Sequence, residues 1–114
     1  MGVPQTQQAE LTRVLQQSAE TRMRAIEEKI SIAFTFCTSV ELEIQLGKLN
    51  RANYLMDKLD SAIDRLTAHI NHPAHVSDKR VKQKFQDKLA VLRQRVSRLH
   101  SEVNQAQSAN GHNA

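Results

Sequence analysis

The stretch ELEIQLGKLNRANYLM, residues 41–56, decides the fold, because every residue in it suits a helix except Gly47. Upstream lies a seam, meaning apolar residues at alternating spacings of three and four, as in a helix packed along its neighbours. Its members are Met23, Ile26, Ile30, Ala33, Cys37, Val40 and Ile44. Continued past Ile44, this seam would reach Gly47 and Arg51, whereas the next apolar series starts at Leu49. Since glycine adopts the left-handed conformation that ends helices, we predict a helical hairpin turning at Gly47.

Two more seams follow the glycine. The second consists of Leu49, Ala52, Met56, Leu59, Ile63, Leu66 and Ile70, with Leu46 and Leu55 widening its face. The third consists of Val81, Phe85, Leu89, Leu92, Val96, Leu99 and Val103. Pro73 lies between them and cannot continue a helix, while Ser77 or Asp78 can cap the start of the next one. Three helices are therefore predicted.

A competing break point lies in TSVE, residues 38–41, which has the form of a capping box with Thr38 as N-cap and Glu41 reaching back. A helix start there would divide the first helix near Cys37. Against this, the first seam passes through Cys37, Val40 and Ile44 without a slip. We favour one continuous helix and keep the break as the alternative.

The fold class expected is all-α, an antiparallel three-helix up-down-up bundle with long first and third helices. The helices are expected at about 9–46, 48–71 and 77–106, within one domain that spans residues 9–107. Residues 1–8 and 108–114 are small, polar and unpatterned, which is typical of disordered ends. VELEIQL, residues 40–46, alternates like a strand but also fits the helical period, and its flanks are helical.

The middle helix is predicted to be the shortest, so the first and third helices should each run past one end of the bundle. Uncovered apolar residues on such ends favour association with a partner. The predicted protein interface consists of Leu11, Val14, Leu15, Leu99 and Val103. A homodimer is one possible result, and the identity of any other protein partner stays open.

Residues 33–62 resemble a tetratricopeptide-type helical hairpin. Ala33 and Phe36 match a small and a large position of its first helix, and Gly47 matches the turn glycine. Ala52 and Met56 match the following small and large positions. The sequence departs from the pattern where Leu59 occupies a small position, and it lacks the closing proline and a second copy. The resemblance implies a helical scaffold that binds other proteins.

Positive charge gathers in the last third of the chain. Residues 76–114 carry a formal charge of +5 and residues 1–75 carry −1. The residues predicted to contact an anion or nucleic acid are Lys82, Lys84, Arg93, Arg95 and Arg98. Only one aromatic residue, Phe85, lies among them, so no base-stacking platform is expected. The alternative is a solvated helix face that partly faces Asp57, Asp60 and Asp64.

The histidines and the cysteine are the remaining candidates for chemistry. His69, His72 and His75 are spaced three apart around Pro73, and a polar helix end is favoured over a metal site. These histidines could make the loop sensitive to pH. Cys37 lies on the first seam, so it is expected to be a buried core thiol. We expect no enzyme activity, no cofactor and no small-molecule substrate.

The resulting functional hypothesis is a small helical protein–protein interaction or assembly module, adaptor or chaperone-like, without catalysis. The alternative hypothesis is a nucleic-acid-binding helical protein that uses the basic third helix. One cysteine fits a reducing compartment, residues 1–20 carry no signal-peptide pattern, and the longest apolar run is IAF, residues 32–34. We therefore expect a cytoplasmic protein without a membrane span.

Overall fold

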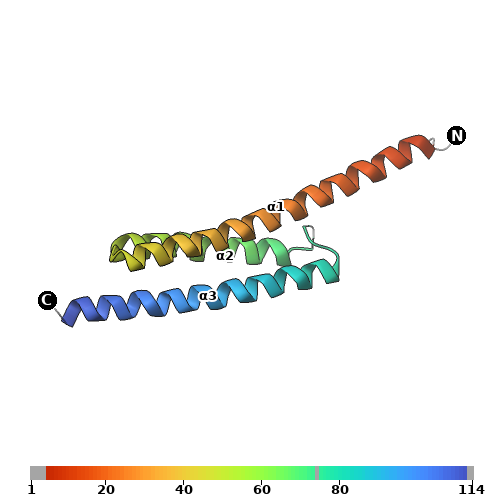
Figure 1. The fold of residues 1–114 in the computed structure, drawn as a ribbon. Helices are drawn as coiled ribbons and strands as arrows, with labels where there is room; N and C mark the ends of the chain where they lie inside the picture. The colour runs from red at the N-terminus through yellow and green to blue at the C-terminus, as the bar shows by residue number, and fades with distance from the viewer. Residues whose placement is uncertain (1–4, 74, 113–114) are drawn as a thin grey trace.

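The computed structural model describes residues 5–73 and 75–112 of the chain. It contains three helices, α1 (Gln5–Gln45), α2 (Leu49–Asn71) and α3 (Lys79–His112), and no strand within the described residues. The helices run up, down and up, and each packs against both of the others (Figure 1). The predicted all-α bundle with long first and third helices is confirmed.

The core consists of the three predicted seams. Every seam residue is buried or half-buried, and no polar or charged residue is buried within the described part of the chain. Leu55 joins the core as expected, whereas Leu46 is 58% exposed at the hairpin. Burial of an aliphatic or aromatic side chain stabilises a fold by about 1.5–3 kcal/mol. The seams therefore hold the bundle together without help from buried polar groups.

The α1–α2 turn has the backbone conformation predicted for Gly47. Its φ angle is +75°, in the left-handed region. The Lys48 N–H donates to the carbonyl of Glu43 at 2.9 Å, and the Gly47 N–H donates to the carbonyl of Ile44 at 3.0 Å. This pair of bonds is the Schellman motif, which satisfies carbonyls at the end of a helix. The turn therefore reverses the chain with few unpaired backbone groups.

Helix α1 continues through the competing break point at Thr38. It is helical from Gln5 to Gln45, and the Thr38 hydroxyl contacts Arg95 of α3. The capping-box alternative is therefore wrong. A continuous seam outweighs a local capping pattern, because a break at Thr38 would displace Val40 and Ile44 from the core.

The second connection, residues 72–78, combines the proline stop with a cap. The Arg80 N–H donates to Oδ1 of Asp78 at 2.8 Å, so Asp78 is the N-cap of α3. Val76, which the seams did not predict as core, is only 6% exposed and closes this end of the bundle. The connection thus contributes to the core as well as redirecting the chain.

The helix ends differ from those expected. α1 begins at Gln5 and α3 ends at His112, whereas these helices were expected at about 9–46 and 77–106, with disorder at residues 1–8 and 108–114. Residues 1–4 and 113–114 lie outside the described part. Residues 5–8 and 108–112 contain no proline, so the helical backbone can continue there beyond the apolar pattern.

The molecule is elongated, with extents of 82 × 20 × 15 Å and a radius of gyration of 20.3 Å. A compact chain of this length would have a radius of gyration of about 13 Å. The difference comes largely from α1, whose first part extends beyond the other two helices (Figure 1). Residues 7–18 are all exposed, and the first buried residue of α1 is Ile26. We call residues 5–22 of α1 the overhang.

Candidate protein interface

The overhang carries an uncovered apolar stripe. Leu11, Val14 and Leu15 have exposed fractions of 61%, 55% and 60%. Spacings of three and four place them on one face of the helix. The structure therefore leaves this half of the predicted interface unpartnered within the chain.

The other half of the predicted interface is not exposed. Leu99 and Val103 have exposed fractions of 2% and 1%, so the expectation that they form an uncovered end of the third helix is wrong. α3 packs against both α1 and α2, and Val103 is its last buried residue among the described side chains. Only residues 104–112 of α3 lie beyond, and the described side chains there are polar or small. Both residues therefore belong to the intramolecular core.

A groove between α1 and α2 was not predicted from the sequence. It has a volume of about 570 Å³ and is lined by residues of these two helices alone, so we call it the α1/α2 groove. Its apolar lining consists of Ile32, Ala33, Phe36, Leu59, Ala62 and Leu66. Lys29, Lys58 and Arg65 contribute positive charge to its lining, and His69 completes it. The groove is thus a second apolar surface, set within positive charge.

Sequence reasoning missed the groove because three of its members are not on the seams. Ile32, Phe36 and Ala62 lie beside them, and Ile32 is 55% exposed. Apolar residues adjacent to a seam are the signal that could have revealed it, since they widen an apolar stripe beyond what two neighbouring helices cover. Within the described chain, part of this wider stripe stays exposed at Ile32.

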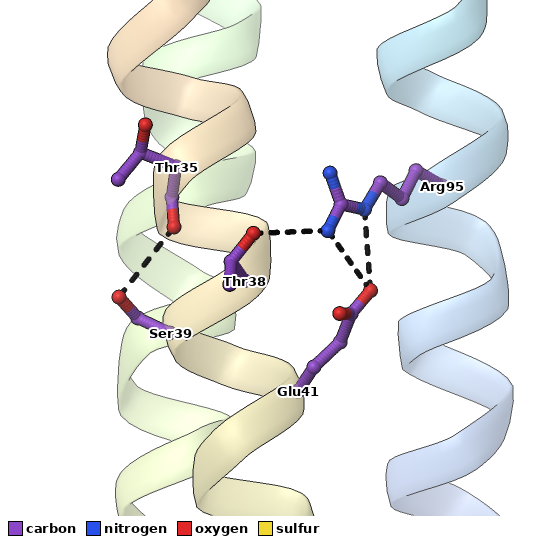
Figure 2. Close-up of polar contacts among 5 residues, drawn as sticks. All are labelled: Thr35, Thr38, Ser39, Glu41 and Arg95. Carbon is purple, nitrogen blue, oxygen red and sulfur yellow. Dashed lines mark hydrogen bonds and ion pairs between the residues drawn. The ribbon is translucent and has the colours of Figure 1, made fainter.

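The predicted anion-binding residues of α3 do not form one outer face. Arg95 forms an ion pair with Glu41 of α1 at 3.1 Å, and it also donates to Thr38 (Figure 2). Lys84 lies 4.0 Å from Glu27 of α1. Two of the five basic side chains therefore point toward α1.

On the other side of α3, Arg93 donates to the Thr67 hydroxyl of α2. Lys82 is half-buried and Arg98 is exposed. Of the three acidic residues expected to face α3, Asp60 does so through His100, whose Nε2 lies 3.0 Å from Asp60 Oδ2. A solvated face with pairs to neighbouring helices accounts for most of this surface.

The rings of His69, His72 and His75 lie together at the end of α2. The His69 and His75 rings stack with centroids 4.0 Å apart, and the His72 and His75 centroids are 5.0 Å apart. Burial lowers the pKa of His69, with smaller contributions from His75, Lys29 and His72. Within the described residues, no group of three potential ligands has a geometry that could hold a metal ion. The cluster is a packed helix end.

Cys37 is fully buried, with an exposed fraction of 0%, so its predicted place in the core is confirmed. Burial raises the pKa of its thiol above the ordinary value. A neutral thiol inside a closed seam cannot reach a substrate. The side chain therefore contributes packing.

Comparison with known proteins finds no matching family model, no matching curated protein and no matching solved structure. The resemblance of residues 33–62 to a tetratricopeptide-type hairpin stays a prediction. Within the described residues, no helix is both long and apolar enough to cross a membrane.

Proposed function

We propose that this protein is a small helical assembly module, adaptor-like and without catalysis, which associates through the stripe on its α1 overhang. The observation that carries this proposal is the exposure of Leu11, Val14 and Leu15 on a helix whose remaining length is closed into a core. A stripe of this kind contributes no packing to its own bundle. Its free energy of burial is available for association.

The free energy of burying the stripe is comparable in size to the cost of association. Full burial of a Leu or Val side chain is worth about 1.5–3 kcal/mol, and more than half of each stripe side chain is still exposed. Three such residues would contribute roughly 3–5 kcal/mol per overhang. Two overhangs buried in one complex would therefore offset much of the cost of association, which is about 4–15 kcal/mol.

The bundle does not need the overhang in order to fold. The buried part of α1 starts at Ile26, with Met23 half-buried beside it. All core residues found in the described chain lie at or after Met23. Changes in the stripe should consequently affect association and leave the fold unchanged, which makes the two effects separable.

The test is the mass in solution, measured by light scattering for the wild type and for the variant with Leu11→Ser and Leu15→Ser. We expect the wild type at twice the chain mass of 12.9 kDa or more, and the variant at the chain mass with an unchanged helical circular dichroism signal. Val91→Ser is the matched control, because Val91 is 58% exposed on α3. A monomeric wild type, or a variant that unfolds, would reject the proposal.

Nucleic-acid binding stays the second hypothesis, supported by the formal charge of +5 on residues 76–114. Lys82 and Arg98 take part in none of the ion pairs found in the described chain. Binding to arbitrary duplex DNA should weaken steeply as salt rises, because counterions are released on binding. No binding at about 50 mM salt would remove this hypothesis.

A further inference from the structure

We infer that the surface receiving the overhang is the α1/α2 groove of a second copy of this chain, so that two copies exchange overhangs reciprocally. This inference rests on the proposed function and specifies its partner. Each chain has one unpartnered apolar helix and one unpartnered apolar groove, and a symmetric pair of chains would cover both. In each half of the pair, the overhang would serve as the fourth helix of the other copy's bundle.

The overhang stripe and the α1 side of the groove lie on one face of α1. This face follows alternating spacings of four and three along an unbroken helix, which keeps its residues in line. Its positions are Leu11, Leu15, Ser18, Arg22, Ala25, Lys29, Ile32 and Phe36. The face is apolar at both ends and small or polar in the middle.

An antiparallel pairing of this face with itself brings the two apolar ends together. In this pairing, three or four residues forward along one chain correspond to the same number of residues backward along the other. All layers of the pairing therefore fit one register. The layers, each written with the overhang residue first, are Leu11 with Phe36, Leu15 with Ile32, Ser18 with Lys29 and Arg22 with Ala25. The two-fold axis crosses α1 between Met23 and Arg24.

The length of the overhang fits this register. Residues 5–22 span about 27 Å of helix. They would lie beside residues 25–42 of the second copy, which end just before its hairpin at Gly47. The seated overhang would therefore follow the other bundle almost to its end without extending past it.

The charged residues of the groove do not obstruct the pairing. Ala33 and Ala62 leave room on the floor, and Lys58 and Arg65 are exposed at the edge, where long side chains keep their charges in water. Lys29 would face Ser18, whose hydroxyl can accept a hydrogen bond. In this register each cation of the α1 face lies opposite an uncharged residue.

The surface area that two seated overhangs would bury is typical of a stable dimer. Roughly 15 residues of overhang cover about 22 Å of a helix about 10 Å in diameter. Half of that circumference buries about 350 Å² on the helix and a similar area on the groove. Two seated overhangs would bury about 1,400 Å², within the usual range of about 1,200–2,000 Å².

The test is disulfide formation in the full chain carrying both Leu15→Cys and Ile32→Cys. Within one chain these positions are about 25 Å apart on a continuous helix, so they cannot form an intrachain bond. In the exchanged dimer, position 15 of each copy would face position 32 of the other copy across the interface. We expect mild oxidation with diamide to convert most of the protein to a covalent dimer on a non-reducing gel, and reducing agent to reverse it.

The two single-cysteine variants are the matched controls. In the predicted register, two copies of Leu15→Cys are about 25 Å apart, as are two copies of Ile32→Cys, so neither variant should cross-link. Cys37 stays in place because it is fully buried. Cross-linking of Leu15→Cys alone would mean that the overhangs lie side by side, and would overturn the inference.

A charge substitution gives an independent readout. Ile32→Glu should reduce the mass of the assembly to that of the monomer. Val91→Glu should not, because Val91 is 58% exposed on α3 and does not line the groove. One combination of results would reject the groove and keep the proposed function. In it, association depends on Leu11 and Leu15 but persists in Ile32→Glu, and the double-cysteine variant does not cross-link. A monomeric wild type would reject both.

Discussion

The guanidinium of Arg95 in α3 forms an ion pair with the carboxylate of Glu41 in α1. Its Nε and Nη2 donate to Oε1 of Glu41 at 3.2 and 3.1 Å, and Nη2 also donates to the Thr38 hydroxyl at 3.1 Å (Figure 2). The pair joins the first helix to the last across 54 residues of sequence. It fixes the register of α3 against α1 by a polar contact at the edge of an otherwise apolar interface.

This pair should contribute modestly to stability. The side chains of Arg95 and Glu41 are 31% and 38% exposed, so solvent screens part of their attraction. A double-mutant cycle with Arg95→Gln and Glu41→Gln, measured by urea unfolding, should give a coupling of about 0.5–1 kcal/mol. The control cycle uses Lys84 and Glu27, which are 4.0 Å apart and 64% and 47% exposed. Equal coupling in both cycles would contradict the prediction, because the Arg95–Glu41 pair would then contribute no more than the longer Lys84–Glu27 pair.

The Gly47 turn should tolerate other residues only at a cost. A Cβ added there meets nothing within 4 Å, so Gly47→Ala tests the positive φ angle alone. We expect a loss of about 1–2 kcal/mol in the free energy of unfolding, and a smaller loss for Gly47→Asn. Lys48→Ala, at the next position, should change little. Chemical denaturation with an unchanged m-value is the measurement, and equal stability of the alanine and glycine proteins would refute the expectation.

Truncation of a side chain should lower stability strongly in the core and hardly at all in the overhang. Phe85 is 1% exposed, and Phe85→Ala should destabilise the bundle by about 3–5 kcal/mol through lost burial and a cavity. Leu11→Ala, at 61% exposure, should change the stability of the monomer by less than about 0.5 kcal/mol. Both are measured by thermal unfolding at a concentration where the chain is monomeric. A large loss in Leu11→Ala would show that the overhang belongs to the core.

Acid should weaken the fold through His69. Its folded pKa lies below the ordinary value of 6.5, because burial, His75, Lys29 and His72 disfavour the charged ring. The unfolded chain therefore binds the proton first as the pH falls. The free energy of unfolding should be unaffected above about 6.5 and should decrease as the pH falls through the folded pKa.

Replacement of His69 isolates this contribution. In His69→Gln the acid-dependent loss between pH 7 and 5 should be smaller than in the wild type, when urea midpoints are compared. Lys29→Met should shift the profile in the same direction, since it removes one positive neighbour of the ring. Parallel profiles for wild type and His69→Gln would exclude His69 as the source.

Much of the fold could be read from the sequence, because burial follows helical spacing closely in a bundle. All three seams enter the core, and the phase shift after Ile44 correctly located the turn at Gly47. Asp78 was one of two predicted caps and is the one that bonds the first turn of α3. These features depend on neighbours within a few residues along the chain, which a single sequence displays directly.

The relative alignment of the helices could not be read in this way. Leu99 and Val103 were expected to be uncovered because the middle helix was predicted to be shorter than the third. A seam shows which face of a helix is apolar, but not which residues of its neighbours lie opposite. The Arg95–Glu41 pair and the groove beside Ile32 depend on that alignment, and so does the stacking of His69 on His75 around Pro73. Each arises from residues that are brought together only when the loops have set the alignment.

The unbroken course of α1 from the overhang into the bundle has a rotational consequence. Each added residue turns everything before it by about 100°, since an α-helix has about 3.6 residues per turn. One alanine inserted between Ala19 and Met23 should aim the stripe of Leu11 and Leu15 at a different side of the molecule, and three or four alanines should nearly restore its direction. The number of residues between the core and the stripe thus determines the direction in which this protein presents its stripe to a partner.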